Sequence, residues 1–158
     1  MVLLYRISKS KYATDLSGEG ARLFGGRWNL KGTPVVYTSD STALATLETL
    51  VHFALDSVPR DRSIVTLYLP DNLPTFKLEN QDLLDKWWVN PAPPKLARIG
   101  QEWIKKNAEV ALVVPSSVTP QAEGLNYILN PKHSDFSQIE IVSVTEYCYD
   151  SRFFLNEY

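Results

Sequence analysis

The chain has 158 residues, of which 44% are hydrophobic and 22% charged, a composition typical of one folded domain and not of a disordered chain. Its formal net charge of −2 argues against direct nucleic-acid binding, which usually requires a strong basic excess. Cys148 is the only cysteine, so no disulfide can form within the chain and a reducing compartment is expected. The N-terminus turns polar too early for a signal peptide, and no apolar run approaches the ~20 residues of a membrane span. We therefore expect a cytoplasmic protein that does not contact membranes.

The first part of the sequence predicts two strands separated by a long glycine-rich segment. Residues Val2–Arg6 and Pro34–Thr38 are rich in aliphatic, β-branched and aromatic side chains, which favour strands. The stretch Ser8–Thr33 between them carries five of the seven glycines. Irregular segments of that length are usually functional or disordered, and the aromatic residues Phe24 and Trp28 indicate that this one is ordered.

An amphipathic helix is predicted to follow the second strand. Ser39, Asp40 and Ser41 are candidate N-caps, because their side-chain oxygens can accept hydrogen bonds from the first free N–H groups of a helix. Glu48 and His52 lie one turn apart at the margin of the apolar face. The apolar residues that recur at helical spacing are Ala43, Leu44, Leu47, Leu50, Val51 and Ala54.

The rest of the sequence mixes strands and helices without regular βαβ alternation, which predicts an α+β fold in a single domain over residues 1–158. The segment Gln121–Phe136 is polar and rich in turn-forming residues. Strands are expected at Ser63–Leu69, Ala111–Val114 and Ile139–Tyr147, and helices at residues 81–88 and 94–107.

Three tryptophans in this part of the chain, Trp87, Trp88 and Trp103, suit either a core or a protein interface, where aromatic residues are enriched. We expect Trp103 in the core.

The glycine-rich segment contains residues suited to a phosphate-bearing ligand. At Gly25 and Gly26 the backbone can approach a ligand closely and turn successive N–H groups toward an anion. The Arg27 guanidinium is planar and can bind phosphate through two hydrogen bonds. Trp28 and Tyr37 offer flat rings for stacking. Taken by itself, the pattern is more typical of a glycine-rich turn with an exposed arginine and a core tryptophan.

Catalytic candidates are few, and we expect no metal site. His52 and His133 lie far apart in the chain, and neither HExxH nor paired-cysteine spacing occurs. No GxSxG motif supports a serine nucleophile. Glu48 is the best-placed carboxylate, although spacing alone also fits a solvated or salt-bridged side chain. The pair Ser116-Ser117 follows a predicted strand, where serine is ordinarily a turn residue.

The combination of these segments resembles the RES-domain family. The similar segments are Tyr5-Arg6, Gly18–Arg22, Gly25–Asn29, Val35–Ser39, Ala43–His52, Val114–Ser116 and Asn126–His133. The family is named for an arginine, a glutamate and a serine, which correspond best to Arg27, Glu48 and Ser116, with Ser117 adjacent to the last.

The resemblance implies a toxin of a bacterial type II toxin–antitoxin system, with a fold similar to ADP-ribosyltransferases: mixed or antiparallel sheets with flanking helices. Its substrate would be NAD⁺, without a further cofactor. Its partner would be a helix-turn-helix antitoxin that covers the active site, in a complex built on a toxin homodimer. The implied reaction is cleavage of the nicotinamide–ribose bond by a glycohydrolase or phosphorylase. Alternatives are a protein ADP-ribosyltransferase and a non-catalytic nucleotide- or protein-binding module.

In this interpretation Glu48 stabilises the positive charge that develops on the ribose. Arg27 and Arg6 hold the pyrophosphate, and Ser116 orients the ribose or the amide. The residues expected to bind NAD⁺ are Arg6, Gly25, Gly26, Trp28, Asn29 and Tyr37.

Overall fold

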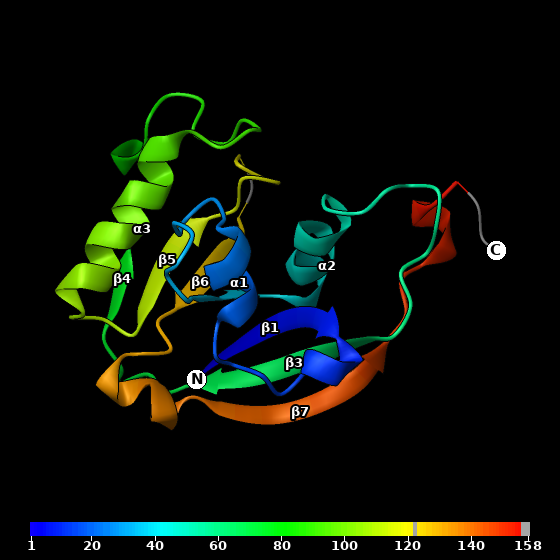
Figure 1. Cartoon of the computed structure of the whole chain (residues 1–158), viewed down its shortest axis with the longest axis horizontal. Coiled ribbons are helices and arrows are strands. Elements are labelled where there is room, and N and C mark those ends of the chain that lie inside the picture. The colour runs from blue at the N-terminus through cyan, green and yellow to red at the C-terminus, as the bar shows by residue number, and fades with distance from the viewer. Residues whose placement is uncertain (122, 156–158) are drawn as a thin grey trace.

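The computed structural model describes residues 1–121 and 123–155 and contains a seven-stranded mixed sheet in the order β4-β5-β6-β2-β1-β3-β7 (Figure 1). Residues 122 and 156–158 of the predicted domain lie outside this description. The strands are β1 (Val2–Lys9), β2 (Val36–Ser39), β3 (Arg62–Leu69), β4 (Thr75–Lys77), β5 (Ala111–Pro115), β6 (Leu125–Leu129) and β7 (Glu140–Tyr147). The α-helices are α1 (Glu19–Phe24), α2 (Thr42–Leu50) and α3 (Pro94–Lys106). The predicted α+β class is confirmed.

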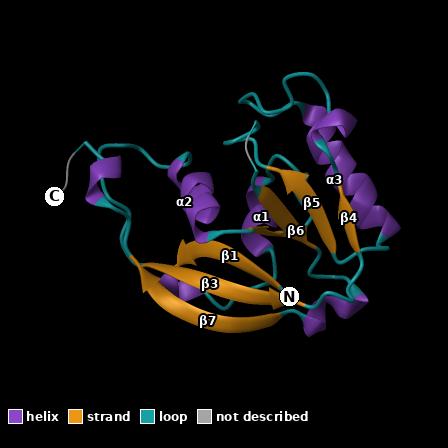
Figure 2. Ribbon diagram, turned by 180° about the vertical axis from the view of Figure 1, so that it is seen from behind, coloured by secondary structure: helices purple, strands orange, loops and turns teal. Residues whose placement is uncertain are grey.

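The sheet bends sharply between β1 and β2. These strands share the single Cα pair Tyr5–Ser39, whereas β1 pairs with β3 along its whole length. Figures 1 and 2 show the β1-β3-β7 half turned away from the half that contains β5 and β6. Helix α2 contacts both β1 and β2. The bend therefore brings α2 beside the strands of both halves.

Opposite faces of the sheet carry different hydrophobic clusters. Residues paired across antiparallel strands share a face, so Val36 and Leu129 lie on one face and Tyr37 and Ile128 on the other. The first face belongs to a cluster with Leu4, Val65 and Leu67. The second face packs against helix α3 and the loops that precede it, through Trp28, Trp87, Leu96 and Trp103. This confirms the expectation that Trp103 is a core residue.

Glycine at position 100 allows α3 to approach the glycine-rich segment closely. A Cβ atom built on Gly100 would lie 1.7 Å from the carbonyl oxygen of Trp28, far inside van der Waals contact. No other residue fits there without moving the helix. The close approach fixes the backbone of Trp28, and with it the neighbouring Arg27.

The structure corrects three secondary-structure expectations. The segment Ser8–Thr33 contains helix α1, which begins after Gly18 in a left-handed conformation (φ 74°). The segment Gln121–Phe136 contains β6, which is central in the sheet because β2 and β5 pair with it on either side. Instead of a helix over residues 81–88, the chain forms a 3-10 turn at Asn80–Asp82 followed by further turns. The sequence-based expectations also missed the short edge strand β4.

The helix predicted after the second strand is α2, and it begins as expected. The Ser41 side chain accepts a hydrogen bond from the Leu44 N–H. The helix ends at Leu50, so His52 and Ala54 lie beyond it. Among the described residues, we find no helix with the length and hydrophobicity of a membrane span.

Candidate functional site

Glu48, on α2, is the centre of a hydrogen-bonded cluster. Its Oε1 accepts a 2.7 Å hydrogen bond from the Ser116 hydroxyl and another from the Asn126 side-chain amide. Ser116 directly follows β5 and Asn126 lies on β6. Both bonds go to one carboxylate oxygen, and no donor among the described residues is paired with Oε2. The carboxylate is thus held through its Oε1 atom by two donors.

The Ser116 hydroxyl is hydrogen-bonded to Glu48 and does not face solvent. Its side chain is fully buried, and besides donating to Glu48 its Oγ accepts hydrogen bonds from the N–H groups of Val118 and Thr119. The hydroxyl proton is therefore committed to the carboxylate. The expected role in orienting ribose or amide directly is not available to it in this conformation. The contact also identifies Ser116, and not Ser117, as the serine that belongs with Glu48.

Asn126 is a site residue that the sequence analysis missed. The Ser39 hydroxyl donates a 2.8 Å hydrogen bond to its Oδ1, which points the Nδ2 group at Glu48. Ser39 and Asn126 are direct partners across β2 and β6. Both residues lie in segments that resemble the RES family, which was the available signal. Their contact depends on β6, and the polar, turn-rich composition of Gln121–Phe136 did not predict a strand there.

Arg27 lies near Glu48 and bridges to the loop that precedes α3. Its Nη1 donates to the carbonyl oxygen of Trp87 at 2.9 Å and its Nη2 to that of Val89 at 3.1 Å. Burial lowers the pKa of the Arg27 guanidinium, and the negative charge of Glu48 opposes this shift. Arginine remains protonated in proteins and has five N–H donors. The group therefore keeps a positive charge and further donors near the carboxylate.

Tyr37 and Asn29 form the frame of the glycine-rich segment. The Tyr37 hydroxyl donates to Asn29 Oδ1 at 2.7 Å and accepts a hydrogen bond from the Trp28 N–H at 3.2 Å. Burial raises the pKa of the Tyr37 phenol, so the ring is neutral at pH 7. A Cβ atom at Gly26 would lie 2.7 Å from the Tyr37 hydroxyl. This contact explains why a glycine occupies that position.

Asn29 and Trp28 are placed inside the protein. The Asn29 amide is buried and donates to the carbonyl oxygens of Ala21 and Thr33. Trp28 is only 3% exposed, so its ring lacks the accessible face that stacking on nicotinamide would need. Both residues support the loop that carries Arg27. Gly25, with φ at 68°, ends α1 immediately before this loop.

Arg6 is not brought to the Glu48 cluster. Side chains alternate along β1, so Arg6 lies on the face of Leu4, opposite to the face on which Tyr5 pairs with Ser39. Its Nη1 donates to the carbonyl oxygen of Asp15 at 2.7 Å. Burial lowers the pKa of the Arg6 guanidinium, and Asp15 is the charge that opposes this shift. A contact between Arg6 and pyrophosphate remains a prediction.

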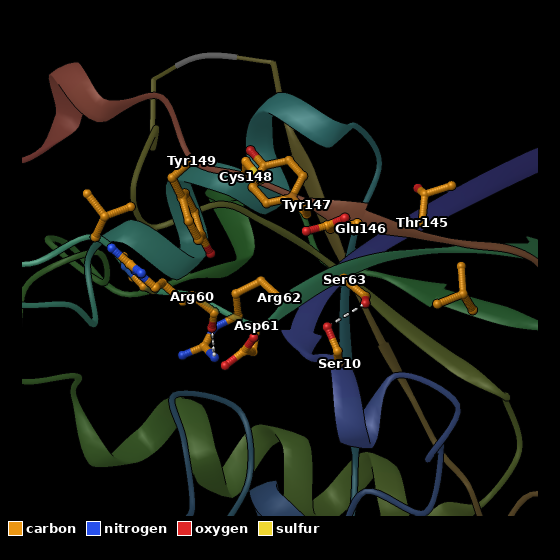
Figure 3. A pocket seen from close by; sticks show the side chains of 13 residues that line it. Ser10, Arg60, Asp61, Arg62, Ser63, Thr145, Glu146, Tyr147, Cys148 and Tyr149 are labelled. Carbon is orange, nitrogen blue, oxygen red and sulfur yellow. Dashed lines mark hydrogen bonds between the residues drawn. The ribbon is translucent and has the colours of Figure 1, made fainter. Parts of the chain in front are cut away.

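An open cavity of about 580 Å³ lies elsewhere, where the loop before β3 meets the end of β7 (Figure 3). Arg60, Asp61, Arg62 and Glu146 line it with both signs of charge, and Ser10 and Ser63 share a 2.8 Å hydrogen bond at its edge. None of the site residues predicted from the sequence lines this cavity. Within the described ranges, no group of His, Cys, Asp and Glu side chains is arranged to hold a metal ion.

Comparison with known proteins shows which family the chain resembles along almost its whole length. The family model described as "RES domain" matches residues 3–150. Toxin Res of Photorhabdus laumondii is 38% identical over 154 residues, covering 96% of each chain. The "Prs ADP-ribosylating toxin" of a Sphingobium species is 37% identical over 142 residues, which are 89% of this chain and 87% of that protein.

A solved structure with the same fold is the toxin–antitoxin complex MbcT–MbcA of M. tuberculosis. The matched chain superposes with a TM-score of 0.73 at 20% identity, over 93% of this chain and 84% of that chain. At this identity the likeness concerns the fold. The family match and the sequence relatives carry the assignment: the chain belongs to the RES-domain family.

Proposed function

We propose that this protein is the toxin of a toxin–antitoxin pair and that it cleaves the bond between nicotinamide and ribose in NAD⁺. The observation that carries the proposal is the Glu48 carboxylate, held through Oε1 by Ser116 and Asn126 and lying near the Arg27 guanidinium. The names of its relatives support it: two that it matches over 96% of its length are called Toxin Res, and a third is called an ADP-ribosylating toxin.

The chemistry of the bond suits a site with one prominent carboxylate. Nicotinamide leaves NAD⁺ as a neutral molecule, so no general acid is needed. The bond from ribose C1′ to the ring nitrogen breaks and its electron pair stays on nicotinamide, which leaves positive charge on the ribose as in glycoside hydrolysis. Glu48 Oε2 stabilises this charge or accepts a hydrogen bond from a ribose hydroxyl. C1′ then takes an oxygen from water or phosphate, which loses a proton to solvent.

Arg27 has the complementary task in this mechanism. Its remaining N–H donors bind the pyrophosphate of NAD⁺, while the two loop carbonyls keep the guanidinium in place. Because the pyrophosphate is joined to the nicotinamide ribose, binding it at Arg27 positions ribose C1′ relative to Glu48. Holding the two reacting parts in a fixed geometry is itself a large source of rate enhancement.

A second reaction is favoured by the name of the Sphingobium relative. A protein ADP-ribosyltransferase would use the same carboxylate and arginine, but would transfer ADP-ribose to a side chain of a target protein. The first steps of the two reactions are identical, and the acceptor distinguishes them. The solved toxin–antitoxin complex of the same fold supports an antitoxin as the physiological partner.

The proposal is tested by incubating the purified chain, free of antitoxin, with NAD⁺ and measuring nicotinamide release with and without phosphate. We expect release that Glu48→Gln reduces by on the order of 10²–10³. Dependence on phosphate would indicate a phosphorylase, and its absence a glycohydrolase. NAD⁺ labelled in the adenosine part would reveal transfer to protein. Without nicotinamide release in any of these conditions, the proposal is wrong.

A further inference from the structure

A series of three tryptophans runs from the core to the surface beside Arg27. Trp28 and Trp87 are buried, with ring centroids 6.3 Å apart. Trp88 packs edge-to-face on Trp87, at a centroid distance of 6.3 Å and an interplanar angle of 86°. In contrast to the other two, Trp88 is 36% exposed. Its ring is thus fixed by a core residue while keeping part of its surface accessible.

The backbone on either side of Trp88 binds Arg27. The guanidinium donates hydrogen bonds to the carbonyl oxygens of Trp87 and Val89, the residues directly before and after Trp88. A partly exposed tryptophan therefore belongs to the loop that Arg27 binds through its backbone. The exposed part of this ring offers a flat apolar surface to a ligand.

The order of groups in NAD⁺ indicates which ligand group lies there. Pyrophosphate separates the nicotinamide riboside from the adenosine. If Glu48 acts on the nicotinamide ribose and Arg27 binds pyrophosphate, the adenosine must lie beyond Arg27 as seen from Glu48. Glu48 lies on α2, whereas the loop that Arg27 binds precedes α3 and carries Trp88.

We infer that Trp88 is the platform on which the adenine ring of the dinucleotide stacks. The inference rests on the proposed function, since it takes the positions of ribose and pyrophosphate from it. Stacking of a base on an aromatic side chain needs no particular hydrogen-bond pattern, because the flat faces supply the contact. The loop thereby serves twice: its carbonyls orient Arg27 and its side chain binds the adenine.

The test compares NAD⁺ with nicotinamide mononucleotide, which has the reacting bond but no adenosine. Trp88→Ala should raise KM for NAD⁺ by roughly 5- to 100-fold, the range for a lost base–aromatic stack, and far more than it raises KM for the mononucleotide. Trp88→Phe, which keeps a flat ring, should restore most of the loss. Leu84→Ala removes another exposed apolar side chain from the same loop and is the matched control.

Direct binding gives a second measurement. ADP-ribose should bind the wild-type chain in a calorimetric titration and bind Trp88→Ala more weakly by a similar factor, with an unchanged circular dichroism spectrum. If nicotinamide is released but both KM and ADP-ribose affinity survive in Trp88→Ala, the adenine platform is refuted and the proposed function stands. The adenine platform is likewise refuted, and the proposed function retained, if Trp88→Ala weakens only the binding of the antitoxin. If the wild-type chain neither cleaves NAD⁺ nor binds ADP-ribose, the proposed function itself fails.

Discussion

The Ser116 hydroxyl donates a 2.7 Å hydrogen bond to Glu48 Oε1, although 68 positions separate the two residues in the sequence. The serine is completely buried and the hydroxyl is held by the backbone of its own turn. The bond therefore fixes the orientation of the carboxylate from the buried side. The serine is a positioning residue for Glu48, and its removal should affect catalysis more than substrate binding.

Ser116→Ala should lower kcat for nicotinamide release by roughly 10- to 100-fold, because a hydrogen bond to a charged group is worth about 1.5–3 kcal/mol. KM for NAD⁺ should change little. Steady-state kinetics measure both values, and Ser117→Ala is the control beside it. A large rise in KM with unchanged kcat would show that Ser116 contacts the substrate instead.

Asn126→Ala should reduce kcat to a similar degree, because Asn126 is the other donor to Glu48 Oε1. Ser39→Ala should have a smaller effect, since Ser39 reaches Glu48 only through the Asn126 amide. A double-mutant cycle tests this chain of contacts. In the Asn126→Ala background, Ser39→Ala should cause no further loss of kcat. Additive losses would contradict an action of Ser39 through Asn126.

Arg27→Lys should raise KM for NAD⁺ by about tenfold with a smaller effect on kcat. Lysine keeps the charge but cannot bind two carbonyls and pyrophosphate with one rigid, planar group. The exposed Arg22, which pairs with Glu19 at 2.6 Å, offers Arg22→Lys as a control for a general charge effect. Equal kinetics of Arg27→Lys and the wild-type chain would show that the forked geometry is unimportant.

Gly100→Ala should destabilise the fold by about 3 kcal/mol, the upper range for an overpacked core, since the added Cβ would lie 1.7 Å from the Trp28 carbonyl oxygen. Thermal or urea unfolding measures the loss. Gly20→Ala is the matched control, because a Cβ there meets nothing within 4 Å and alanine favours the α1 helix by roughly 0.5–1 kcal/mol. If both variants unfold like wild type, the packing of α3 is looser than described.

Stability should fall at alkaline pH partly through Tyr37. Burial raises the pKa of its phenol above the ordinary value of about 10, so the unfolded chain loses this proton at a lower pH than the folded chain. The contribution is complete below about pH 10 and is lost as pH rises toward the folded-state pKa. In Tyr37→Phe the melting temperature should be lower at pH 7, since two hydrogen bonds are lost. It should then decline less steeply above about pH 10 than in the wild-type chain.

The sequence by itself was sufficient for the family and the α+β class, and it singled out Arg27, Glu48 and Ser116 as candidate site residues, because these depend on local patterns. The Ser41 cap and the apolar spacing predict α2, and α2 carries Glu48 at its margin. The motif around Gly25 and Gly26 predicts an ordered loop that presents Arg27. Such signals reside in contiguous residues and can be recognised before any strand is paired.

Only the tertiary structure decided which partners these residues have. Asn126 reaches Glu48 because β6 pairs with β2 and β5, and these contacts span long stretches of chain. Strand alternation sends Arg6 to the opposite face, and the approach of Gly100 encloses Trp28 in the core. The turns between Asn80–Asp82 and α3 leave Trp88 partly exposed and turn the carbonyl oxygens on either side of it toward Arg27. Burial and cross-strand pairing arise from all elements together, so no local pattern in the sequence contains them.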